Sequence, residues 1–122
     1  MGRKILVTED SPTILEILKT VLAEEGYEVI AAADGQQALD LARTEKPDLI
    51  VLDLMLPKID GYKVCRMLKF SERFKNIPII MLTARSKESD EQLGREVGAD
   101  AYIRKPFQPE VMIDEIKKML KS

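Results

Sequence analysis

Polar side chains follow four short apolar segments of this chain. They are three carboxylates, one hydroxyl and one amine: Glu9, Asp10, Asp53, Thr83 and Lys105. Burying an unpaired charge is costly, so a carboxylate at the end of a buried strand needs a chemical reason. The set suits a divalent cation together with a phosphoryl group. Carboxylate oxygens bind hard cations, and an amine and a hydroxyl can contact phosphate oxygens.

The composition excludes several other kinds of site. The chain has 122 residues, no histidine and a single cysteine, Cys65, which rules out a His-based triad, a zinc site and an internal disulfide. Any metal must therefore be held by oxygen, which points to Mg²⁺, Mn²⁺ or Ca²⁺. A net charge of −2 gives no reason to expect direct binding to nucleic acid or to an anionic membrane. With a lone cysteine and no long apolar run, we expect a cytoplasmic protein.

Short apolar runs alternate with segments of helical period along the chain. The runs lie near 4–8, 27–32, 49–53, 78–83 and 100–104, and they lack polar alternation. This pattern favours parallel strands that are buried on both faces. Helix start signals follow at Ser11-Pro12, Asp34, Asp60, near Lys87 and at Pro109.

Five βα units predict an α/β fold, a flavodoxin-like three-layer sandwich around a five-stranded parallel sheet of order 2-1-3-4-5. We expect one domain over residues 1–122. In this order the first and third strands are neighbours, and ligands bind beyond the carboxyl ends of the strands. Glu9, Asp10 and Asp53 should therefore converge at one edge of the sheet.

Three neighbouring carboxylates repel one another. At an effective dielectric of ~20, a like-charge pair ~4 Å apart costs about 4 kcal/mol. Lys105 offsets one of the charges, and a Mg²⁺ ion offsets two. Asp53 would then be both a metal ligand and a nucleophile that accepts a phosphoryl group. The developing charge would be met by Mg²⁺, Lys105 and the Thr83 hydroxyl.

With these residues in this order, the chain resembles the receiver domain of bacterial two-component response regulators, which has the chemotaxis-regulator fold. The resemblance covers essentially all of the chain. It implies that Asp53 is phosphorylated, that Asp10 binds Mg²⁺ directly and that Glu9 binds it largely through water. It adds the backbone carbonyl of Met55 as a further ligand. Many family members carry two aspartates where this chain has Glu9-Asp10.

The same resemblance implies the remaining contacts and a switch. Thr83 and Lys105 would contact the phosphoryl oxygens, and the Lys105–Pro106 peptide would be cis. Tyr102 matches the aromatic residue that moves inward when Thr83 is drawn to the phosphate. This movement would change the face formed by the fourth helix, the fifth strand and the fifth helix.

We therefore predict a signalling phosphoacceptor rather than an enzyme. A sensor histidine kinase or a histidine phosphotransfer protein would donate the phosphoryl group, because this chain has no histidine. Asp53 would accept it, with Mg²⁺ or alternatively Mn²⁺ bound, and slow hydrolysis would remove it. A downstream protein or a second copy of the chain would read the changed face.

Three alternatives compete with this interpretation. A haloacid-dehalogenase phosphatase requires a second aspartate two residues after the nucleophile, where this chain has Met55. An FMN carrier needs a hydroxyl- and glycine-rich loop after the first strand, where this chain has Glu9-Asp10-Ser11-Pro12 and no tryptophan elsewhere. The third is a receiver fragment of a larger DNA-binding response regulator. Residues 117–122 resemble the end of a finished helix without a linker, which favours a stand-alone receiver.

Overall fold

The structure is a computed structural model that describes residues 3–54, 56, 58–83 and 98–120. The described residues form strands and helices with these bounds: β1 Lys4–Thr8, α1 Pro12–Glu24, β2 Glu28–Ala32, α2 Gly35–Glu45, β3 Leu49–Asp53, α3 Gly61–Lys69, β4 Ile79–Thr83, β5 Ala101–Arg104 and α5 Pro109–Leu120. The fourth helix predicted from the sequence, near 87–97, lies outside the described residues.

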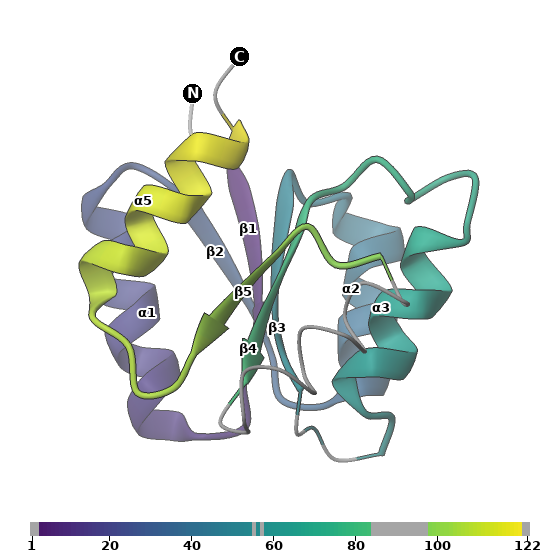
Figure 1. The fold of residues 1–122 in the computed structure, drawn as a ribbon, viewed down its shortest axis with the longest axis horizontal. Coiled ribbons are helices and arrows are strands. Elements are labelled where there is room, and N and C mark those ends of the chain that lie inside the picture. The colour runs from purple at the N-terminus through teal and green to yellow at the C-terminus, as the bar shows by residue number, and fades with distance from the viewer. Residues whose placement is uncertain (1–2, 55, 57, 84–97, 121–122) are drawn as a thin grey trace.

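The five strands form one parallel sheet in the order β2-β1-β3-β4-β5, which confirms the predicted flavodoxin-like fold. Helices α1 and α5 cover one face of the sheet, and α2 and α3 cover the other (Figure 1). The carboxyl ends of β1, β3, β4 and β5 therefore open at one edge of this sandwich. None of the described helices is long and apolar enough to cross a membrane.

Polar side chains cap three of the helices at the positions that the sequence predicts. Each accepts a hydrogen bond from a backbone N–H three residues later: Ser11 from Ile14 at 3.4 Å, Asp34 from Gln37 at 2.8 Å and Asp60 from Lys63 at 2.9 Å. Because these caps occupy N–H groups that a helix leaves unpaired, they fix where α1, α2 and α3 begin.

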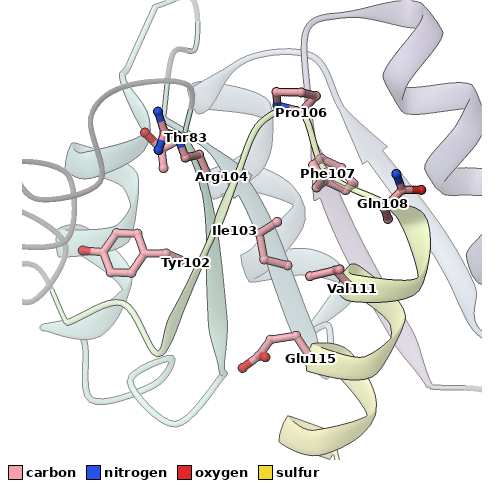
Figure 2. Close-up of a pocket in the computed structure, with 9 residues that line it drawn as sticks. All are labelled: Thr83, Tyr102, Ile103, Arg104, Pro106, Phe107, Gln108, Val111 and Glu115. Atoms are coloured by element: carbon pink, nitrogen blue, oxygen red, sulfur yellow. The ribbon is translucent and has the colours of Figure 1, made fainter.

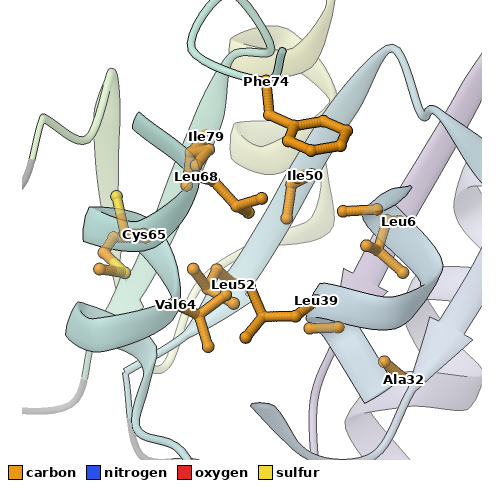
Figure 3. Packing of buried hydrophobic residues seen from close by; sticks show 13 residues of the cluster. Leu6, Ala32, Leu39, Ile50, Leu52, Val64, Cys65, Leu68, Phe74 and Ile79 are labelled. Carbon is orange, nitrogen blue, oxygen red and sulfur yellow. The ribbon is translucent and has the colours of Figure 1, made fainter. Parts of the chain in front are cut away.

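The core lies in two layers, one on each side of the sheet. Every residue of β3 and β4 is buried, which explains why these segments lack polar alternation. Figure 3 shows the layer between the sheet and helices α2 and α3, where Leu52 lies near Leu39 and Val64. The second layer joins the opposite face of the sheet to Leu18 and Leu22 of α1 and Met112 of α5.

Two glycines allow the loop after β3 to lie close to its neighbours. A Cβ atom at Gly61 would overlap the carbonyl oxygen of Asp53 and the Cα of Leu54, and one at Gly35 would overlap the carbonyl of Ile59. The Gly61 N–H also donates to the Leu54 carbonyl at 3.0 Å. The start of α3 is thus held directly against the end of β3.

A lysine at the end of α3 joins three parts of the chain. The Lys69 Nζ lies 2.7 Å from Asp100 Oδ2 and donates to the carbonyls of Ile77 at 2.7 Å and Lys75 at 3.1 Å. Asp100 in turn accepts a hydrogen bond from the Ile79 N–H at 2.8 Å. The Lys69 side chain is only 10% exposed, although Asp100 is 40% exposed, and these bonds hold α3 against the start of β4 and the residue before β5.

Candidate functional site

Three carboxylates meet where β1 and β3 end side by side. Residues Thr8 and Leu52 are paired in the parallel register of these strands, so Glu9 and Asp53 follow at the same level of the sheet. The carboxylates of Glu9, Asp10 and Asp53 offer ligand oxygens that all lie within 4.8 Å of one another. Glu9 and Asp53 are buried, and Asp10 is exposed. The cluster is therefore built from the sheet but remains open to solvent on one side.

Lys105 brings a positive charge into this cluster from beyond β5. Its Nζ lies 2.7 Å from Asp53 Oδ2 and 3.0 Å from Glu9 Oε1. Its backbone N–H donates to the carbonyl of Thr83 at 2.6 Å, which ties it to the end of β4. The Lys105–Pro106 peptide bond is cis. The ends of β1, β3 and β5 thus contribute charges to one cluster, and the end of β4 holds the Lys105 backbone.

Burial and mutual charge shift the pKa values of two of these groups. Burial raises the pKa of the Glu9 carboxyl, and the nearby Asp53 charge acts in the same direction; hydrogen bonds from the Ser11 N–H and Lys105 only partly oppose them. Burial lowers the pKa of Lys105, but its bonds to Asp53 and Glu9 outweigh that effect, so its pKa is raised. The ammonium is therefore held firmly charged, while the carboxylates carry more negative charge than it can neutralise.

This excess of negative charge fits a divalent cation. The carboxylates supply three negative charges and Lys105 one positive charge, and all three carboxylates present oxygen, the ligand that Mg²⁺ and Mn²⁺ prefer. The exposed Asp10 leaves room for water ligands, which Mg²⁺ retains in most protein sites. Met55, whose carbonyl was expected to be a further ligand, lies outside the described residues.

Thr83 and Tyr102 belong to β4 and β5, the strands that lie on the opposite side of β3 from β1. Thr83 ends β4 one residue beyond Leu82, the register partner of Asp53, and its side chain is buried. A cavity of about 530 Å³ is lined by Thr83 and Tyr102 together with residues of β5, α5 and the loop between them. In Figure 2, Thr83 and Tyr102 point to the same side of β5, whereas Val111 and Glu115 border the cavity from α5. Half-buried Tyr102 also packs against the α2/α3 core layer.

Two features of the site are not predicted from the sequence. The Ser11 N–H donates to Glu9 Oε2 at 3.0 Å, so this residue orients a carboxylate as well as capping α1. Gly61, which the sequence marks only as part of a helix start, is needed because any side chain would strike the Asp53 backbone. In the sequence, the Asp60-Gly61 pair is the pattern that could have indicated the close contact of Gly61 with Asp53.

The comparison with known families gives the class of the protein. Residues 5–117 match the family model of the response regulator receiver domain. The chain therefore belongs to the receiver domains of two-component response regulators.

The relatives with curated names are longer proteins. The chain is 49% identical over 121 residues to the alkaline phosphatase synthesis transcriptional regulatory protein PhoP of Bacillus subtilis (strain 168), covering 99% of this chain and 50% of that protein. It is 50% identical to the probable transcriptional regulator ycf27 of Porphyridium aerugineum, covering 97% of this chain and 48% of that protein. The chain thus spans about half the length of the curated relatives it matches.

Solved structures share the fold over nearly the whole chain. Chemotaxis response regulator CheY4 of Vibrio cholerae is 32% identical with a TM-score of 0.92, covering 98% of this chain and 100% of that one. The receiver domain of a sensor histidine kinase from Pseudomonas aeruginosa PAO1 is also 32% identical, with a TM-score of 0.91 and full coverage of both chains. That structure has a magnesium ion coordinated in its active site cleft.

Proposed function

We propose that Asp53 is the phosphoacceptor of this receiver domain. The observation that supports this most directly is the Lys105 Nζ at 2.7 Å from Asp53 Oδ2, inside a cluster of three carboxylates. A sensor histidine kinase or a histidine phosphotransfer protein would present phosphohistidine at the open side of the cluster, where Asp10 is exposed.

In the proposed reaction, a carboxylate oxygen of Asp53 attacks the phosphorus atom of the phosphohistidine. A phosphorus–oxygen bond forms, the phosphorus–nitrogen bond breaks, and the imidazole leaves with that electron pair. As the new bond forms, the Lys105 ammonium would exchange its contact with the Asp53 carboxylate for one with a phosphoryl oxygen. The Thr83 hydroxyl would donate a hydrogen bond to another phosphoryl oxygen. Slow attack by water on phosphorus later returns Asp53 to its carboxylate, so the chain acts as a signal carrier and not as a turnover enzyme.

Glu9, Asp10 and Asp53 would hold the Mg²⁺ ion, or Mn²⁺ in its place, with the Met55 carbonyl as a further ligand. When bound, the cation neutralises charge on the transferring phosphoryl group. Lys105 neutralises only one of the three carboxylates, which supports the need for a cation of higher charge. Because Asp10 is the exposed member, we propose that it meets the cation directly while buried Glu9 acts mainly through water.

Acetyl phosphate tests the assignment of Asp53 without a partner protein. Incubation with acetyl phosphate and Mg²⁺ should raise the mass of the parent chain by ~80 Da, the mass of one phosphoryl group on a covalent carboxylate acceptor. Asp53→Asn should show no increase. Asp40→Asn, which changes an exposed carboxylate of α2, is the matched control and should be labelled like the parent. Labelling of Asp53→Asn at the parent rate would refute the assignment.

We further propose that Thr83 and Tyr102 transmit phosphorylation to the face that includes β5 and α5. A phosphoryl group brings about −1.5 to −2 charge and three acceptor oxygens. If Thr83 moves toward it, Tyr102 can enter the space beside β4, because both residues line the same cavity. A downstream protein or a second copy would bind the changed face, whose other part, the predicted fourth helix, lies outside the described residues.

The phosphate mimic beryllofluoride separates acceptance from transmission. In the parent chain it should shift the NMR signals of residues 98–110. Thr83→Ala should still bind the mimic, seen as shifts at Asp10 and Lys105, yet show much smaller shifts around Tyr102. Thr44→Ala, an exposed threonine on α2, is the control. An undiminished response around Tyr102 in Thr83→Ala would contradict the proposed coupling.

A second candidate is that this chain is the receiver part of a DNA-binding regulator that acts in the cytoplasm. It is favoured by one observation, since the curated relatives are named as transcriptional regulators and are about twice as long. The length of the complete gene tests it. An open reading frame that continues into a DNA-binding domain would support this candidate, and a stop codon after Ser122 would refute it.

A further inference from the structure

Helix α3 exposes one continuous stripe of side chains. Lys63, Arg66, Met67 and Phe70 are all exposed, and their spacing of three, four and seven residues places them on one side of the helix. Val64, Cys65 and Leu68 face the sheet instead. Met67 is 47% exposed and Phe70 is 72% exposed, which makes them two of the four large hydrophobic residues exposed in the described part of the chain.

Two cations, Lys63 and Arg66, belong to this stripe. Within the described residues, neither Lys63 nor Arg66 takes part in an ion pair, although the chain as a whole has a net charge of −2. The Arg66 guanidinium lies over the Phe70 ring, 5.9 Å from its centroid. Asp60 borders the stripe, and its Oδ1 accepts a hydrogen bond from the Lys63 N–H at 2.9 Å. The stripe is thus a cationic and apolar surface on an acidic protein.

We propose that this stripe is a docking surface for an acidic amphipathic helix of another protein. Leucine or a similar side chain on the partner would cover Met67 and Phe70, and flanking carboxylates would meet Lys63 and Arg66. A hollow of about 230 Å³ beside the stripe, lined by Tyr62, Lys63 and Arg66 together with Asp60, gives one partner side chain a place to enter. The surface belongs to a different helix from those next to Lys105, so this inference does not rest on phosphorylation of Asp53.

Charge favours a protein partner over a membrane or nucleic acid. Each basic residue near an anionic membrane contributes about 1 kcal/mol, and stable attachment takes a cluster of about four to eight of them. Nucleic-acid binding likewise grows with the number of phosphates that cations neutralise. Two cations on an acidic domain are too few for either mode. Two cations beside two exposed apolar side chains match the mixed contacts of a helix bound in a groove.

A synthetic helix tests the proposal. The probe is a peptide of about 18 residues, long enough to form a helix on binding, with leucines along one face and glutamates elsewhere. Titrated into the unphosphorylated chain, it should shift the NMR signals of residues 61–70 above all others. Phe70→Ser and Arg66→Glu should each weaken binding about tenfold, as expected for a central contact worth about 1.4 kcal/mol.

Control variants and control peptides test whether binding is specific to this stripe. Ile17→Ser on α1 and Lys118→Glu on α5 make the same kinds of change at other exposed positions and should leave the affinity within about twofold. A peptide of the same composition with scrambled leucines, and one with lysine in place of glutamate, should bind at least tenfold more weakly. The proposal is overturned if the shifts lie away from α3, if Phe70→Ser binds like the parent, or if phosphatidylglycerol vesicles bind this stripe while the acidic peptide does not.

Discussion

Replacing Asp10 with asparagine should stabilise the metal-free protein and remove its response to Mg²⁺. Asp10 lies within 4.8 Å of two other carboxylates, whereas the Lys105 ammonium contacts only Glu9 and Asp53. The substitution keeps the size of the side chain and removes one negative charge. In the absence of metal it therefore relieves repulsion, and in its presence it removes a proposed ligand.

The distance sets the size of the effect. Two unit charges 4.8 Å apart repel by ~3.5 kcal/mol at an effective dielectric of ~20 and by ~0.9 kcal/mol in bulk water. Asp10 is exposed, so the lower figure applies to each of its two neighbours, and the variant should gain about 1–2 kcal/mol in EDTA. With a urea m-value of ~2 kcal/mol per molar, the midpoint of unfolding should rise by about 0.5–1 M.

Magnesium should stabilise the parent more than it stabilises Asp10→Asn. At a Mg²⁺ concentration ten times the measured Kd of the parent, binding adds ~1.4 kcal/mol to the parent's stability. Asp10→Asn should gain much less, so the difference between the two proteins should shrink or reverse. Urea unfolding at pH 7.5 in EDTA and in Mg²⁺, with Asp40→Asn as a control, measures both effects. If Asp10→Asn is less stable than the parent in EDTA, or is equally stabilised by Mg²⁺, the reasoning is refuted.

Three further predictions concern the frame around the site. Gly61→Ala should lower the free energy of unfolding by about 1–3 kcal/mol and slow phosphorylation by acetyl phosphate, because its Cβ would overlap the Asp53 carbonyl. Unchanged urea midpoints and phosphorylation rates would count against this contact. Burial raises the pKa of the Cys65 thiol from 9.0 to about 12. The unfolded chain therefore loses this proton first, and stability should fall above pH 9 by up to about 1.4 kcal/mol per pH unit, a slope that Cys65→Ala should lack. Lys69→Met should lower the free energy of unfolding by about 1–2 kcal/mol, because it leaves two carbonyls and the partly exposed Asp100 without their partner. Lys75→Met, at an exposed position, should lower it by under about 0.5 kcal/mol. Similar urea midpoints for both variants would contradict this.

The strands and helix starts were predictable because local chemistry determines them. β3 and β4 are buried on both faces, so apolar residues suit every position except their last residues, Asp53 and Thr83. Ser11, Asp34 and Asp60 cap helices through their own side chains, and a cap needs no information from distant residues. The convergence of Glu9 and Asp53 followed from the strand order alone.

Contacts between distant residues were not predictable in the same way. Sequence spacing could place Lys105 near the carboxylates but could not show that its ammonium contacts both Glu9 and Asp53. The partners of Lys69 depend on how the segment after α3 folds back over the sheet. From the sequence alone, Lys69 is expected to be exposed to solvent, and only the packing around it shows that its side chain is largely covered.

The complete burial of β3 and β4 has a consequence for how the site can respond. Central strands of this kind open only when the whole domain unfolds, so their amide protons should be among the slowest to exchange with solvent. Asp53 and Thr83 are the last residues of these two strands. We therefore expect the backbone that leads into each of them to stay closed while their side chains reorient about their own bonds. The domain would thus hold its proposed acceptor and the neighbouring hydroxyl on its most slowly opening part.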